Sequence, residues 1–140
     1  MYELAYCSTA TRNLLPEDIT ALLNTAVAYN SKHNITGCLL YYKQEFIQLL
    51  EGQKEIVKEL FSRISTDARH SDILVLAEGE KEKRTFDQWN MAYYNLNDED
   101  VQDFSRNIFV DNFIAFSAYA QKRTFPTILF WSKVHTMLEK

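Results

Sequence analysis

The stretch that decides the fold is NSKHNITGCLLYYKQEFIQLLEG, residues 30–52. It predicts a helix end followed by two strands, 38–42 and 45–51, which a two-residue polar turn joins. Asn30 closes an apolar helix face and Gln48 interrupts an apolar strand. An unpaired buried amide costs about 1–3 kcal/mol, so each side chain needs a hydrogen-bond partner. That partner is either backbone, with Asn30 as a helix cap and Gln48 as an edge residue, or a ligand with a polar edge.

Outward from this stretch, strands and helices alternate. Residues 2–8 alternate as a strand does, with Tyr6 and Ser8 on one face and Cys7 on the other. Pro16 opens a helix that reaches Asn30, and a second apolar stripe predicts a helix over 54–68. A β-branched strand follows at 73–77. The order β-α-β-β-α-β predicts an α+β, ferredoxin-like sandwich with two helices on one face of the sheet.

The C-terminal part adds to this core. Residues 86–94 alternate as an extra strand, with Trp89 and Met91 on one face. Residues 97–123 predict one or two helices and residues 127–138 a last helix, which we expect to cover the other face of the sheet. Between the sheet and its two main helices we expect a cavity. It would be lined by Tyr6, Asn30, Gln48 and the polar cluster at 63–70.

Composition narrows the class of protein. The 140 residues carry a net charge of −4 and no basic stripe, which argues against direct nucleic-acid binding. There is no apolar run long enough to span a membrane and no signal-peptide pattern at the N-terminus, so we expect a cytoplasmic protein. Cys7 and Cys38 are expected to be buried apolar residues. With three glycines, no phosphate-binding loop and scattered histidines, nothing resembles a hydrolase, a kinase or a metalloenzyme.

Five short motifs, in this order and at these spacings, resemble one known family. They are AYCS at 5–8, N-x4-ITG at 30–37, FIQLLEG at 46–52, R-x3-D-x-RH at 63–70 and F-x2-WNM at 86–91. The chain resembles the BLUF domain, a flavin-binding sensor of blue light. The resemblance covers residues 1–95, and residues 96–140 resemble the helical extension of the short, single-domain members.

The resemblance implies a site. Tyr6 resembles the redox-active tyrosine of the family, and Gln48 the glutamine between that tyrosine and the flavin. Asn30 resembles the asparagine that hydrogen-bonds the polar edge of the ring, and Ile35 with the helix stripe would pack on the ring. Further positions resemble contacts to the ring edge and the flavin side chain (Arg63, Asp67, Arg69 and His70) or relays of the signal (Ser8, Trp89 and Met91). The implied cofactor is non-covalent FAD, for which FMN or riboflavin can substitute.

The resemblance also implies a mechanism. Light excites the flavin, Tyr6 gives up an electron and a proton that soon return, and the Gln48 amide is left turned over or tautomerised. The flavin absorption shifts to the red, and the strand around Trp89 and Met91 passes the change to the C-terminal helices. One departure is Tyr29, where family members often carry His or Asn. The flavin contact is expected to differ there, and Tyr29 is a candidate competing electron donor.

Three functions remain open at this point. The first is a photoreceptor, not an enzyme, that signals through a protein partner or a change in oligomeric state, with the aromatic C-terminal helices as the contact surface. The second is a flavin-dependent oxidoreductase, which reduction by NADPH would reveal. The third is a ligand-free interaction module in which Asn30 and Gln48 are satisfied internally.

Overall fold

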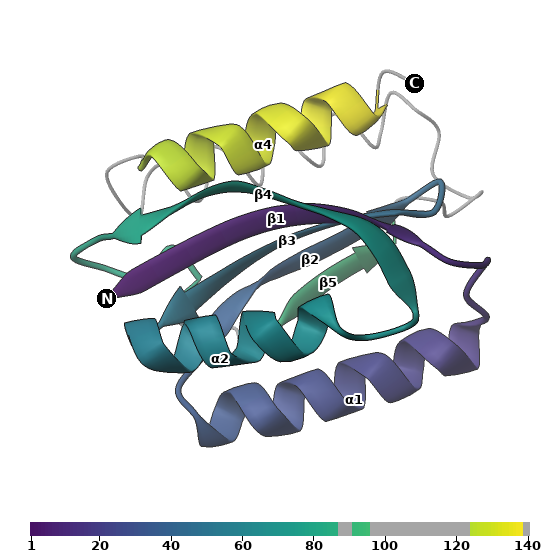
Figure 1. Cartoon of the computed structure of the whole chain (residues 1–140), viewed down its shortest axis with the longest axis horizontal. Coiled ribbons are helices and arrows are strands. Elements are labelled where there is room, and N and C mark those ends of the chain that lie inside the picture. The colour runs from purple at the N-terminus through teal and green to yellow at the C-terminus, as the bar shows by residue number, and fades with distance from the viewer. Residues whose placement is uncertain (87–90, 96–123, 139–140) are drawn as a thin grey trace.

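The computed structural model of the chain describes residues 1–86, 91–95 and 124–138. The elements follow the predicted order (Figure 1). They are β1 (Tyr2–Ala10), α1 (Pro16–Lys32), β2 (Thr36–Tyr42), β3 (Glu45–Gly52), α2 (Lys54–Ser65), β4 (His70–Glu80), β5 (Ala92–Asn95) and α4 (Phe125–Leu138). Among these residues no helix combines the length and the apolar character needed to cross a membrane.

The strands form one sheet in the order β4-β1-β3-β2-β5. The first four are antiparallel to their neighbours, and β5 adds in parallel beside β2. Helices α1 and α2 lie on one face of the sheet and α4 lies on the other (Figure 1). This arrangement confirms the predicted ferredoxin-like fold with an extra strand and a C-terminal helix on the opposite face.

The quoted stretch folds as the β2–β3 hairpin. Lys43 and Gln44 form its turn, with φ of 47° and 66°. A two-residue turn with both φ values positive matches the twist of the two strands. Near the other end of β2, Gly37 lies so close to β3 that a Cβ would come within 2.0 Å of the Leu49 carbonyl oxygen. Glycine is therefore required there by space rather than by its conformation.

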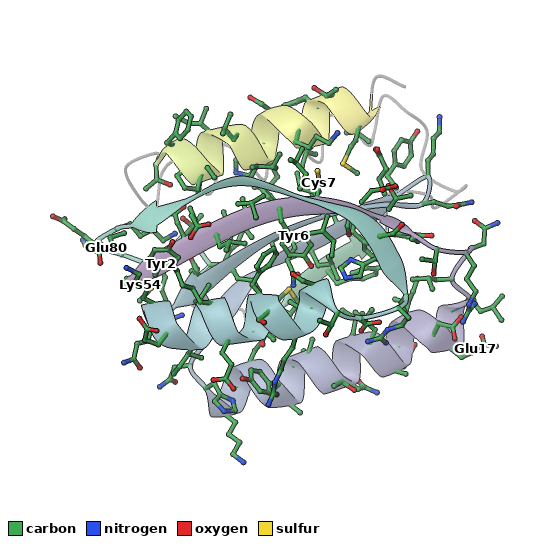
Figure 2. The ribbon with its side chains drawn as sticks, viewed as in Figure 1. Tyr2, Tyr6, Cys7, Glu17, Lys54 and Glu80 are labelled. Atoms are coloured by element: carbon green, nitrogen blue, oxygen red, sulfur yellow. The ribbon has the colours of Figure 1, made fainter. Side chains whose placement is uncertain are left out.

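Alternation along the central strands separates two cores. From β1, Tyr6 points toward α1 and α2, while Cys7 points toward α4 (Figure 2). The α4 face is one continuous apolar cluster, to which Phe130, Trp131, Val134 and Met137 contribute from the helix. Both cysteines are buried and neither forms a disulfide. The strands β1 and β3 are thus covered on both sides.

Several predicted boundaries were wrong. Strand β4 is much longer than 73–77 because it pairs with β1 as an edge strand whose outer residues are exposed. Helix α2 ends at Ser65, so the segment 66–69 is a turn rather than helix. Helix α4 starts at Phe125, with Pro126 in its first turn, where proline is tolerated. The predicted helices at 97–123 and the residue Trp89 lie outside the described residues.

Candidate functional site

A cavity of about 240 Å³ lies between the sheet and helices α1 and α2. It divides the core of this face into two clusters, one around Tyr6 and Leu50 and the other around Leu39 and Phe46. Its wall is mostly apolar with a small number of polar groups, the pattern of a small-molecule site. The lining residues are Tyr6, Leu22, Thr25, Ala26, Tyr29, Asn30, Leu39, Phe46, Gln48, Leu60, Arg63, Ile64, Asp67, Arg69 and His70.

Two of the polar lining residues face each other across neighbouring strands. Tyr6 on β1 pairs directly with Gln48 on β3, and the Tyr6 hydroxyl donates a hydrogen bond to Gln48 Oε1. The two side chains are 3% and 6% exposed. Burial, with a smaller effect of the Asp67 carboxylate, raises the pKa of Tyr6. The phenol therefore keeps its proton and remains a donor to the amide.

The other end of the Gln48 amide faces a weaker partner. Its Nε2 lies 3.4 Å from Met91 Sδ, and a thioether sulfur is only a weak acceptor. An amide has a donor and an acceptor in a nearly symmetric shape, so turning it over exchanges the two. In the turned position Nε2 would donate to the Tyr6 oxygen. Little hydrogen bonding to Met91 would be lost, so the contacts in this part of the site do not lock the amide in one orientation.

Ser8 reaches the site through His70, the first residue of β4. His70 Nε2 is 2.6 Å from the Ile64 carbonyl oxygen, which can only accept, so Nε2 carries a proton. In the neutral ring Nδ1 is then the acceptor for the Ser8 hydroxyl, at 2.7 Å. The ring centroid lies 6.4 Å from that of Tyr6. This chain of bonds fixes the His70 ring in the wall of the cavity.

Two arginines, Arg63 and Arg69, are among the residues that line the cavity. Arg69 binds the Asp67 carboxylate through Nε and Nη2, the latter at 2.5 Å, and this guanidinium lowers the pKa of Asp67. The Arg63 guanidinium lies over the Tyr29 ring, 5.3 Å from its centroid. Both arginines are exposed to solvent as well as lining the cavity. Either guanidinium could contact an anionic group of a ligand.

The structure brings most of the predicted site residues together. Asn30 lines the cavity and is the only buried residue of α1. Met91 lies against Gln48, and Ser8 does not line the cavity but hydrogen-bonds His70, which does. Ile35 is fully buried in the core and does not line the cavity. Residues that the sequence reasoning did not single out also line it, namely Thr25, Leu39, Phe46, Leu60 and Ile64.

These features fit a planar aromatic ligand with one polar edge and an anionic tail. The apolar wall suits the faces of a ring system, the two amides suit its polar edge, and the arginines suit the tail. A family model described as "BLUF: Sensors of blue-light using FAD" matches residues 1–92.

The chain belongs to the BLUF family.

Membership makes the chain a relative of light-regulated flavoproteins. It is 36% identical over 90 residues to the photoactivated adenylate cyclase subunit beta of Euglena gracilis, over 64% of this chain and 10% of that protein. The structure of BlsA in its ground state matches with a TM-score of 0.66 and 30% identity, over 76% of this chain and 72% of that one. Klebsiella pneumoniae BlrP1, described with FMN and cyclic diGMP, matches with a TM-score of 0.75 and 26% identity, over 99% of this chain and 34% of that one. The chain thus spans about a tenth of the length of the adenylate cyclase subunits that it matches.

Proposed function

We propose that this chain is a blue-light photoreceptor that binds FAD non-covalently in the cavity between α1, α2 and the sheet. The observation that carries the proposal is the Tyr6–Gln48 hydrogen bond, which lies in the cavity wall. The volume is below the usual range for enclosing a whole ligand of FAD's size, so the isoalloxazine ring would lie inside and the phosphates outside. Arg63 and Arg69 at the partly exposed side favour FAD or FMN over riboflavin.

Different polar residues would contact different parts of the flavin. The amides of Asn30 and Gln48 would hydrogen-bond the polar edge of the ring. Ile35 packs in the same core cluster as Tyr6 and would not touch the ring. Arg63, Asp67, Arg69 and His70 would contact the ring edge and the side chain of the flavin. Arg69 is paired closely with Asp67, whereas Arg63 has only a longer, exposed contact of 3.8 Å to Glu59. Arg63 is therefore the arginine that could more easily turn to a phosphate.

When bound, the flavin supplies the absorption of blue light and an excited state that accepts an electron. Tyr6 is the buried phenol in the wall, and its proton already points at Gln48 Oε1. Loss and return of that proton would remove and restore the bond that holds the amide, and so allow Gln48 to turn or tautomerise. Met91 contacts the amide directly and would register the change, with Trp89 and Ser8 as further relays.

We further propose that the signal leaves as a change in contact with a protein partner or in oligomeric state. The helical extension, residues 96–140, is the proposed contact surface, and residues 1–95 the sensor. The sensor itself performs no catalysis in this proposal. The relatives whose names include a cyclase support an effector protein as the partner. The acidic net charge and the absence of a basic stripe argue against direct binding of nucleic acid.

The test is the absorption spectrum of the purified chain with FAD, in the dark and immediately after blue light. We expect flavin bands that shift reversibly to longer wavelength. Bands that bleach would indicate net flavin reduction and favour an oxidoreductase. A chain that stays colourless after incubation with FAD would contradict flavin binding and favour the ligand-free interaction module.

A further inference from the structure

A buried ion cluster lies on the face of the sheet opposite the cavity. It consists of Glu3 on β1, Glu51 on β3 and Lys81, the residue that follows β4, and we call it the lysine cluster. Lys81 Nζ is 2.5 Å from Glu51 Oε2 and 3.3 Å from Glu3 Oε2. The three side chains are between 0% and 3% exposed. Two carboxylates thus share one lysine out of contact with water.

Stability alone is a weak reason for such a cluster. Desolvating charges costs several kcal/mol for each ion, and well-packed apolar residues often replace a buried ion pair without loss. The surrounding α4 face is a continuous apolar core that would accept such residues. The position of the lysine cluster and the segments that it holds indicate another role.

The cluster lies on the same two strands as the Tyr6–Gln48 pair, which we call the photoactive pair, about 10 Å further along and on the opposite face of the sheet. Glu3 pairs with Glu51 in the same β1–β3 register that pairs Tyr6 with Gln48. On each strand the two residues are three positions apart, so their side chains point to opposite faces of the sheet. A displacement of β1 against β3 at the photoactive pair is therefore transmitted to the two carboxylates by the same pair of strands.

Each carboxylate holds a different segment. Glu51 accepts hydrogen bonds from the backbone N–H groups of Thr85 and Phe86, at 2.8 and 2.6 Å, and so fixes the connection from β4 toward Met91. Glu3 Oε1 accepts a hydrogen bond of 2.8 Å from the Thr124 hydroxyl. Thr124 precedes α4, and its hydroxyl also accepts a bond from the Thr127 N–H in the first turn of that helix. The N-terminus of α4 is thus attached to β1.

The lysine has two possible arrangements within the cluster. It hydrogen-bonds Glu51 Oε2 and Thr85 Oγ1, and it forms a longer ion pair, 3.3 Å, with Glu3 Oε2. Among the described residues, Glu3 Oε2 has no hydrogen-bond partner. A relative movement of about half an ångström would bring Lys81 within normal hydrogen-bonding distance of Glu3. Pairing with Lys81 would change the charge that Glu3 presents to Thr124. A switching element requires two discrete arrangements of the same groups, here Lys81 hydrogen-bonded to Glu51 or to Glu3.

We propose that the lysine cluster couples the Tyr6–Gln48 pair to helix α4, by transferring Lys81 between Glu51 and Glu3 and so changing the hold of Glu3 on Thr124. This inference rests on the proposed photoreceptor function. It assigns Glu3, Glu51 and Lys81 as positioning residues on the output side, with no contact to the flavin.

The test uses hydrogen–deuterium exchange of the full chain loaded with FAD, in the dark and under continuous blue light. The readout is the light-minus-dark difference in residues 124–138, because a purely structural role would change exchange equally in both conditions. Glu3→Gln keeps an acceptor for Thr124 but removes the charge that attracts Lys81. Thr124→Val removes the hydroxyl that reaches Glu3. Thr136→Val is the matched control, because within the part of the chain that the structure describes its hydroxyl bonds to the Ser132 carbonyl oxygen of the same helix.

We expect the red shift of the flavin to persist in all three variants. The wild type and Thr136→Val should show the same light-minus-dark difference in α4, and Glu3→Gln and Thr124→Val should lose at least half of it. If Glu3→Gln does not fold, Thr124→Val decides the matter. A full difference in Thr124→Val, or a wild type that shifts to the red without any change in α4, overturns this inference alone. A wild type without a red shift overturns both this inference and the proposed function.

Discussion

On the face of the sheet that α4 covers, apolar side chains form one continuous core, whereas on the α1–α2 face a cavity divides the core into two clusters. The polar groups differ in the same way. On the α4 face they are fully desolvated charges that pair with one another, and on the α1–α2 face they are neutral amides, a phenol and partly exposed ions. The α4 face therefore contributes much of the free energy of folding. The α1–α2 face is less densely packed because it contains a binding cavity.

The largest loss in the free energy of unfolding is expected from a substitution that breaks the lysine cluster. Glu51→Leu leaves Lys81 buried without its close carboxylate and removes the acceptor of the Thr85 N–H. Removing one partner of a buried ion pair costs about 3–5 kcal/mol. Urea denaturation followed by circular dichroism measures it, with Asp67→Asn as a control at the partly exposed side of the cavity. A loss below about 1 kcal/mol would show that the cluster is not desolvated as described.

A matched pair of leucines compares the two faces directly. Leu49 is fully buried on the α4 face, and Leu22 of α1 lines the cavity half-buried. Leu49→Ala should lower the free energy of unfolding by about 2–5 kcal/mol. Leu22→Ala, which removes a side chain that is already partly exposed, should lower it by about 1 kcal/mol or less and weaken flavin binding instead. Denaturation of both variants without flavin checks the contrast, and equal losses would contradict it.

Arg63 tests the partly exposed side of the cavity. Arg63→Ala removes a cation–π contact that is worth about 0.5–1 kcal/mol at an exposed site, so the unfolding free energy should change little. Loss of the Arg63 guanidinium should weaken FAD binding about tenfold, as expected for one charge-assisted hydrogen bond to a phosphate. Fluorescence titration with riboflavin, which lacks phosphates, is the control and should be nearly unaffected. Equal weakening of both ligands would place Arg63 at the ring and not at the tail.

The smallest expected effects are opposite pH dependences of stability on the two faces. The Arg69 guanidinium lowers the pKa of Asp67, so its contribution is present at neutral pH and is lost as the pH falls through the lowered value. Burial raises the pKa of Glu3, and the longer contact with Lys81 does not offset this effect. The contribution of Glu3 to stability is therefore present in acid and is lost as the pH rises through the raised pKa. For the partly exposed Asp67 we expect about 1 kcal/mol or less.

Asp67→Asn and Glu3→Gln isolate these two contributions. Relative to Asp67→Asn, the wild type should become less stable below about pH 4, and relative to Glu3→Gln it should become less stable as the pH rises from about 4.5. Denaturant unfolding between pH 3 and 8 gives both differences. Slopes of the same sign would mean that Glu3 is fully paired with Lys81.

Local patterns in the sequence predicted the fold and the side of the sheet on which the site lies. Alternation placed Tyr6 and Gln48 on the helix-facing side of the sheet, and helical spacing placed Asn30 there too. That Tyr6 and Gln48 are directly opposite depends on strand register across 42 residues, which no local pattern contains. Leu39 and Phe46 were missed as lining residues because an apolar wall and an apolar core look alike in a sequence.

The lysine cluster was missed for a different reason. Glu3 and Glu51 resemble the charged residues of an exposed strand, yet each lies on the same face as buried neighbours such as Cys7 and Leu49. That alternation was the available signal for their burial. Lys81 gave no such signal, because its place in the cluster depends on where β4 ends beside β1.

The most direct test of the account is the light-minus-dark absorption spectrum of Gln48→Leu loaded with FAD. Leucine keeps the size and burial of the residue and removes the amide that turns. The account predicts a yellow protein that binds FAD and shows no reversible red shift under light that shifts the wild type. A normal red shift in this variant would contradict the assignment of Gln48 as the switching group.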